Sequence, residues 1–138
     1  MYLLDTDVLS SLLRRRPSAV LIARLATVPV EQQFTSSITL GELLYGAYRL
    51  PERATLLAER IEAHLLSNLV VLPFDSPAAR RYGEIRAQLE RRGTLIGDAD
   101  LRIAAIALTH RLVMVTGNVR HFARVPGLQV ENWLEAAP

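Results

Sequence analysis

Residues 2–9, with the sequence YLLDTDVL, decide the fold of this chain. The run Tyr-Leu-Leu is typical of a short buried strand, and Asp5 ends it. The apolar positions that follow recur at helical spacing as far as Leu13, and the sequence RRRP at 14–17 ends that pattern. A buried strand that passes directly into a helix is the beginning of a β-α unit. Residues 2–13 therefore predict an α/β protein with a parallel sheet.

Short strands and helices continue to alternate along the rest of the chain. We predict further strands at 34–37, 69–72, 112–115 and 128–130. We predict helices at 18–27, from an N-cap at Thr39 through Ala47, at 52–68, at 76–92 and at 98–110. We find no internal repeat, low-complexity run or linker. The sequence therefore predicts a single domain, residues 1–138, with three α/β/α layers around a mainly parallel sheet of four to five strands.

The composition excludes several kinds of chemistry. The chain has no Cys, which excludes disulfides, thiolate nucleophiles and Cys-based zinc sites. All sixteen basic residues are Arg, which excludes mechanisms that need a Lys amine, such as those of P-loop proteins and receiver domains. The net charge of +2 does not by itself indicate nucleic-acid binding, because that depends on clustered charge. We find neither a signal peptide nor a membrane-spanning run, so we expect a cytoplasmic protein with no membrane partner.

Acidic side chains follow the predicted strands at one edge of the sheet. Asp5 ends the first strand, and Glu42 lies in the first turn of the helix after the second. Asp98 and Asp100 open the helix before the fourth. In open parallel sheets, sites form outside the carboxyl ends of the strands. Because crowded carboxylates repel one another unless a cation neutralises them, and oxygen ligands favour Mg²⁺ or Mn²⁺ over Zn²⁺, this placement predicts a metal site.

Each of these acids also has a structural interpretation. Asp7 suits an N-cap role just after the strand, and Glu42 suits the acid of a capping box that begins at Thr39. Asp98 complements the dipole of its helix, which is the interpretation that we favour for it. Asp5 is harder to explain in this way, because an acid at the end of an apolar strand is unfavourable when it is buried without a partner. The three His residues show no ligand spacing.

Four motifs give the chain a resemblance to the PIN-domain nucleases and, within them, to the VapC toxins of bacterial toxin–antitoxin pairs. They are LDTD at 4–7, SITLGEL at 37–43 followed by Gly46, DLRIAA at 100–105, and VTGNVRHF at 115–122. The segments RVPGL at 124–128 and ENW at 131–133 are also similar to the C-terminus of these toxins. The resemblance covers essentially the whole chain, and it implies the PIN fold.

The resemblance also assigns roles to individual residues. It implies that the metal ligands are Asp5, Glu42 and Asp100. It implies that Thr6 hydrogen-bonds within the site. The fourth family position falls on Asn118, which keeps an oxygen but lacks the charge. We therefore expect Asn118 to position a water or a ligand. Without a carboxylate at this position, a second tightly bound ion is not expected.

Two further acids depart from the pattern of the family. Asp98 precedes the third family acid by two residues and is interpreted as an accessory acid. Asp7 stands where these toxins often carry Asn.

The activity implied by the resemblance is Mg²⁺-dependent hydrolysis of RNA phosphodiester bonds, with Mn²⁺ as a substitute ion and tRNA or another structured cellular RNA as substrate. It also implies neutralisation by a VapB-like antitoxin and a homodimer. The apolar faces of the helices at 18–27 and 52–68 are candidate interfaces. Candidate phosphate contacts are Arg14 to Arg16, Arg91, Arg92, Arg102, Arg120 and Arg124.

Two other functions compete with this interpretation. The motif DTDVL at 5–9 is similar to the nucleophile motif of haloacid-dehalogenase-type phosphatases, in which Asp5 would be the nucleophile and Asp7 a general acid. The sequence GDAD at 97–100 is similar to their metal motif, but the lack of Lys and the unexplained Glu42 motif oppose this assignment. A PIN scaffold that binds RNA or protein without cutting is the non-enzymatic alternative, and the uncharged Asn118 is the reason to consider it.

Overall fold

The fold is built on a five-stranded sheet, seen here in a computed structural model that describes residues 1–136. The strands lie in the order β3-β2-β1-β4-β5, and every neighbouring pair is parallel. Their bounds are β1 (Tyr2–Leu4), β2 (Gln33–Ser36), β3 (Val70–Leu72), β4 (Val113–Val115) and β5 (Val130–Glu131). The predicted parallel sheet is confirmed, although the last strand begins two residues later than expected.

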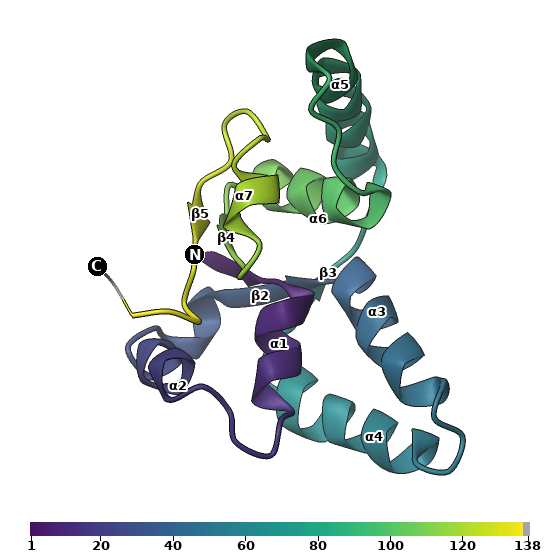
Figure 1. The fold of residues 1–138 in the computed structure, drawn as a ribbon, viewed down its shortest axis with the longest axis vertical. Coiled ribbons are helices and arrows are strands. Elements are labelled where there is room, and N and C mark those ends of the chain that lie inside the picture. Colours follow the sequence, from purple (N-terminus) through teal and green to yellow (C-terminus); the bar gives the residue numbers. More distant parts are fainter. Residues whose placement is uncertain (137–138) are drawn as a thin grey trace.

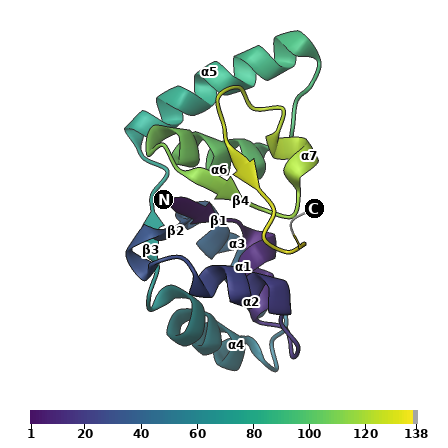
Figure 2. The ribbon, with the colours of Figure 1, turned by 90° about the vertical axis from the view of Figure 1, so that its left-hand side faces the viewer.

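Helices cover both faces of this sheet. They are α1 (Thr6–Leu12), α2 (Ala19–Ala26), η1 (Val30–Gln32), α3 (Ser37–Tyr48), α4 (Ala54–Arg60), η2 (Ile61–Leu66), α5 (Ser76–Arg92), α6 (Asp98–Thr109) and α7 (Val119–Phe122). Figures 1 and 2 show α5, α6 and α7 on one side of the sheet and α1, α2 and α4 on the other, which confirms the three-layer prediction. Among the residues described, no helix has the length and apolar character to cross a bilayer.

The core consists of two apolar clusters, one on each face of the sheet. Neighbouring residues of a strand point to opposite faces, so Leu3 packs against α5 and α6 while Leu4 packs against α1 and α3. Met114 and Val115 of β4 divide in the same way, and all four side chains are fully buried. The central strands are therefore covered on both faces, as is usual for a parallel sheet.

The structure corrects two of the predicted helices. The single helix expected at 52–68 is α4 followed by η2, a stretch of π-helix whose wider turns an apolar pattern does not distinguish from α-helical ones. The N-cap of α3 is Ser36, whose Oγ accepts a hydrogen bond of 3.0 Å from the Thr39 N–H. Thr39 therefore lies inside the helix. Glu42 is six residues beyond the true N-cap, so it is not a capping-box acid.

Candidate functional site

The strand order places a topological switch point between β1 and β4. The chain adds β2 and β3 on one side of β1 and β4 and β5 on the other, so the direction of winding changes at this point. Ligand sites of open α/β sheets form at such switch points. Because Leu4 pairs with Val115, the residues that follow them, Asp5 and Thr116, meet at the carboxyl edge. The Thr116 hydroxyl donates a hydrogen bond of 2.8 Å to Asp5 Oδ2.

Asp5 is buried at this edge, with only 6% of its surface exposed. Burial raises its pKa from 3.8 to about 7, and the negative charges of Asp7 and Asp100 contribute to the rise. Hydrogen bonds from the Thr6 backbone and the Thr116 hydroxyl oppose it. The ionised carboxylate is therefore held in surroundings that disfavour its charge, which a bound cation would relieve.

Glu42 reaches the site from α3 and is held by the residue that follows Asp5. The Thr6 hydroxyl lies 2.7 Å from Glu42 Oε1 and donates to it. Thr6 Oγ1 also lies 3.1 Å from the Thr39 hydroxyl, which is 3.2 Å from the Ser36 hydroxyl. This row of hydroxyl groups joins the first turn of α1 to the first turn of α3, and it fixes the Glu42 carboxylate beside α1.

Asp100 faces the same site from the first turn of α6. Burial and the nearby Glu42 charge raise the pKa of Asp100, and the Asp7 charge adds to this, while His121 opposes it. His121 Nδ1 lies 3.9 Å from Asp100 Oδ2 and 2.8 Å from the side-chain nitrogen of Asn118. Asn118 is thus linked to Asp100 through the imidazole ring. Electrostatic interactions therefore link acids from three separate parts of the chain, Asp5 and Asp7, Glu42, and Asp100.

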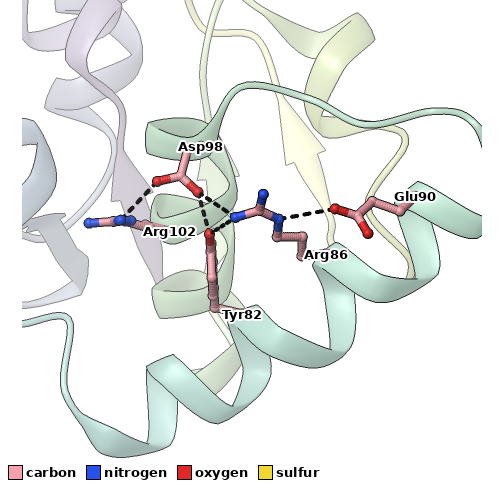
Figure 3. Close-up of polar contacts among 5 residues, drawn as sticks. All are labelled: Tyr82, Arg86, Glu90, Asp98 and Arg102. Atoms are coloured by element: carbon pink, nitrogen blue, oxygen red, sulfur yellow. Dashed lines mark hydrogen bonds and ion pairs between the residues drawn. The ribbon is translucent and has the colours of Figure 1, made fainter.

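Asp98 lies outside this group, in the polar cluster that Figure 3 shows between α5 and α6. It accepts a hydrogen bond from the Tyr82 hydroxyl, and its oxygens lie 2.9 Å from Arg102 Nη2 and 3.5 Å from Arg86 Nη1. The Tyr82 hydrogen bond, followed by the charges of Arg102 and Arg86, lowers the pKa of Asp98. Asp98 therefore joins two helices, and it is Asp100 that faces the other acids.

Asp7 does not cap α1 as predicted. Its Oδ2 accepts a hydrogen bond of 2.8 Å from the backbone N–H of Gly117, and its Oδ1 lies 3.5 Å from the Thr116 hydroxyl. A Cβ atom on Gly117 would lie 2.7 Å from Asp7 Oδ2 and 2.9 Å from Leu134 Cδ1, so any other residue here would displace the ends of both side chains. The capping prediction is wrong because the Asp7 carboxylate accepts from Gly117, on the other side of the switch point, and the N-cap position of α1 is Asp5.

Sequence reasoning missed Thr116 and His121 as members of the site. Thr116 is fully buried and directly follows β4, just as Asp5 directly follows β1. The sequence shows that both residues directly follow a predicted strand. It does not show that they lie together, because that depends on the pairing of β1 with β4. His121 lacks ligand spacing to another His, and its place beside Asp100 depends on the short helix α7.

The donor chemistry of the site fits a hard divalent cation. The oxygens of Asp5, Glu42 and Asp100 are of the kind that Mg²⁺ and Mn²⁺ prefer. Burial, with a smaller contribution from neighbouring acids, raises the pKa of Asp5 and Asp100, and a cation would offset both effects. Within residues 1–136, no three His, Cys, Asp or Glu side chains stand ready to hold a metal ion. The carboxylates would therefore have to rotate together around an ion.

Comparison with known proteins identifies relatives over nearly the whole chain. The family model for the PIN domain matches residues 2–128. "Ribonuclease VapC2" of Haemophilus influenzae is 38% identical over 135 residues, which cover 96% of this chain and 98% of the relative. "tRNA(fMet)-specific endonuclease VapC" of Salmonella typhimurium is 38% identical over 134 residues, which cover 96% and 97%.

Solved structures agree with these relatives. The FitAcB structure from Neisseria gonorrhoeae contains a chain with a TM-score of 0.90 and 34% identity, and the match covers 99% of this chain and all of that one. DNA-bound VapBC from Salmonella typhimurium gives a TM-score of 0.82 with 38% identity, covering 96% and 97%. PIN-domain ribonucleases are generally metal-dependent, in keeping with the carboxylates described above. The chain therefore belongs to the PIN-domain family and, within it, to the VapC ribonucleases.

Proposed function

We propose that this chain is a Mg²⁺-dependent endoribonuclease that hydrolyses phosphodiester bonds in tRNA or another structured cellular RNA and acts as a VapC-type toxin. The observation that carries the proposal is the buried Asp5 carboxylate at the β1/β4 switch point, whose pKa is raised to about 7 beside two other acids. A carboxylate in these surroundings gains most from a bound cation. Mn²⁺ has the same ligand preference and should replace Mg²⁺.

Three carboxylates, Asp5, Glu42 and Asp100, would hold the ion. When bound, Mg²⁺ supplies a Lewis acid that activates a water molecule and offsets negative charge at the phosphoryl group. The remaining work falls to the side chains of the chain itself. Thr116 orients the Asp5 carboxylate and Thr6 orients that of Glu42, through hydrogen bonds of 2.8 and 2.7 Å.

Asn118 and the nearby arginines would handle the substrate. Asn118 offers an amide instead of a carboxylate, so in this proposal it positions water or RNA and does not hold a second ion. Arg120 is exposed on α7, two residues further on, and can contact phosphates. Arg102 is less available, because it pairs with Asp98 and lies over the rings of Phe74 and Tyr82.

A VapB-like antitoxin is the proposed partner, as the VapBC relative suggests. A mostly apolar groove of about 220 Å³ between α1, α3 and the α4–η2 segment supports this, since Glu42 lies in its wall. The other lining residues are Ser10, Leu13, Leu43, Gly46, Ala47, Leu57 and Ile61. An apolar antitoxin segment in the groove would bring a cationic side chain to the acids. A homodimer and action in the cytoplasm, where cellular RNA is found, complete the proposal.

The test uses the full chain, purified free of antitoxin, with end-labelled tRNA in the presence and absence of Mg²⁺. We expect discrete cleavage products that disappear on chelation and return when Mg²⁺ is restored. Asp5→Asn should lower the rate by at least about 100-fold, the upper end of the effect of losing a second-shell partner of a metal site. Asp98→Asn removes a carboxylate at the other face of the α6 terminus and serves as the matched control.

Three outcomes would contradict the proposal. Cleavage that persists in Asp5→Asn at the same Mg²⁺ concentration would show that Asp5 is not a ligand. RNA binding without products would favour the non-catalytic scaffold. Release of phosphate from a small phosphomonoester would favour the phosphatase, although the general acid of that mechanism would be Asp7, which accepts the Gly117 N–H here.

A further inference from the structure

Asp7 connects two parts of the site that are 110 residues apart in sequence. It lies in the first turn of α1, while its hydrogen-bond partner Gly117 lies in the segment 116–118 between β4 and α7. The distance of 2.8 Å between the Gly117 nitrogen and Asp7 Oδ2 is that of a well-formed hydrogen bond. The contact therefore ties this segment to α1 across the β1/β4 switch point.

The segment 116–118 makes two contacts that reach the proposed metal ligands. The Thr116 hydroxyl donates to Asp5 Oδ2 at 2.8 Å and accepts the Asn118 N–H at 3.0 Å. The side chain of Asn118 lies 2.8 Å from His121, which faces Asp100. Movement of the Gly117 peptide would therefore disturb the surroundings of both Asp5 and Asp100.

We propose that Asp7 is a positioning residue for the nuclease reaction, and that it holds the segment 116–118 in place by accepting the Gly117 N–H. The inference rests on the proposed function for its catalytic consequence, but the hydrogen bond itself can be tested separately. The contact also depends on glycine at position 117, because a Cβ there would lie 2.7 Å from Asp7 Oδ2 and displace it. The acceptor oxygen of Asp7, and not its charge, performs this role.

The first test is made on the metal-free full chain. The chain has seven glycines, and only Gly117 follows a threonine. Labelling with ¹³C-carbonyl threonine and ¹⁵N-glycine therefore identifies the Gly117 amide in an NMR spectrum without further assignment. Asp7→Leu removes the acceptor while keeping the branching at Cγ, whereas Asp7→Asn keeps an acceptor oxygen. We expect hydrogen exchange at Gly117 to become at least 10-fold faster in Asp7→Leu and to stay close to wild type in Asp7→Asn.

The second test is RNA cleavage at saturating Mg²⁺, so that altered ion affinity does not enter the comparison. Asp7→Leu should lower kcat by about 10- to 100-fold with a smaller change in KM, as is typical when the support of a metal site is lost. Asp7→Asn should recover most of that loss. Gly117→Ala should resemble Asp7→Leu, because its Cβ displaces the carboxylate. Glu59→Leu, an exposed acid on α4, is the control for replacing a carboxylate by an apolar side chain.

The outcomes separate this inference from the proposed function. If Asp7→Asn is as impaired as Asp7→Leu, the charge of Asp7 is what matters and the positioning role is wrong. Unchanged exchange at Gly117 in Asp7→Leu would also overturn it. If Asp7→Leu does not fold, Asp7→Asn and Gly117→Ala still decide the question, since only the second should speed exchange. The amide at position 117 of Gly117→Ala is then observed with ¹⁵N-alanine in place of ¹⁵N-glycine, because no other Ala of the chain follows a Thr. A wild-type chain that cleaves no RNA would refute the proposed function, while the exchange data would still test the hydrogen bond.

Discussion

Replacing Asp5 by Asn should stabilise the metal-free protein at neutral pH, even though the change removes a proposed metal ligand. The pKa of Asp5 is raised from 3.8 to about 7 in the fold, mainly by burial. At about 1.4 kcal/mol per pKa unit, the ionised carboxylate costs the folded state about 4 kcal/mol. Asn keeps the shape and avoids this cost. Exchanging the hydrogen bond with Thr116 offsets about 1 kcal/mol of the gain.

The stabilisation that we expect from Asp5→Asn grows with pH. Because the folded state binds the proton more tightly than the unfolded state, the stability of the wild type falls as the pH rises from about 4 to about 7 and is then constant. Asn at position 5 does not titrate. The difference in free energy of unfolding between variant and wild type should therefore be small at pH 4 and reach about 3 kcal/mol above pH 7.

Urea unfolding followed by circular dichroism, with EDTA present, measures this difference at pH 4, 5.5, 7 and 8. Asp98→Asn is the control, because its neighbours lower the pKa of Asp98 and so favour the charged form. Asp98 contributes stability above its usual pKa, which is lost as the pH falls. Its replacement should therefore destabilise the protein at pH 7. A difference between Asp5→Asn and wild type that does not change with pH would refute the reasoning.

Three further predictions follow from the same site and core. At pH 8, Mg²⁺ at about 100 times its Kd should stabilise the wild type by about 2.7 kcal/mol and Asp5→Asn far less; equal stabilisation in thermal unfolding would place the ion elsewhere. At limiting Mg²⁺, the cleavage rate should fall as the pH drops through about 7, because a proton on Asp5 competes with the ion. Added Mg²⁺ should move the midpoint of this pH profile to lower pH, and a midpoint independent of Mg²⁺ would contradict the competition. Leu3→Ala should lower the free energy of unfolding in urea by about 3 kcal/mol because Leu3 is fully buried, and a loss below about 1 kcal/mol would be inconsistent with that packing.

The sheet and the position of the acids were predictable because they follow from local patterns. Apolar runs of three or four residues marked β1, β3 and β4, and the acid after β1 together with those near the starts of α3 and α6 marked the edge where a site forms. The helix α5 was also predictable at both ends. Asp75 caps its first turn, and Gly93 ends it with a φ of +66°, which suits glycine.

The partners of individual side chains were not predictable, because they lie on other elements. Local rules favoured a cap for Asp7, yet its donor is Gly117. The choice between Asp98 and Asp100 likewise depends on which side of α6 faces α5, and sequence position alone puts both in the same turn. Only the family resemblance selected Asp100 in advance, and the contacts of Asp98 with Tyr82 and Arg102 could not be predicted from its position.

The central position of β1 also matters for synthesis of the chain on the ribosome. One edge of β1 is covered as soon as β2 emerges, but the other stays open until β4, about 110 residues after β1, has been made. Until then, Asp5 has no Thr116 beside it and the open edge exposes unpaired backbone groups to chaperones and proteases. A translation product that stops short of β4 therefore lacks both the β1/β4 switch point and the hydrogen bond that orients Asp5.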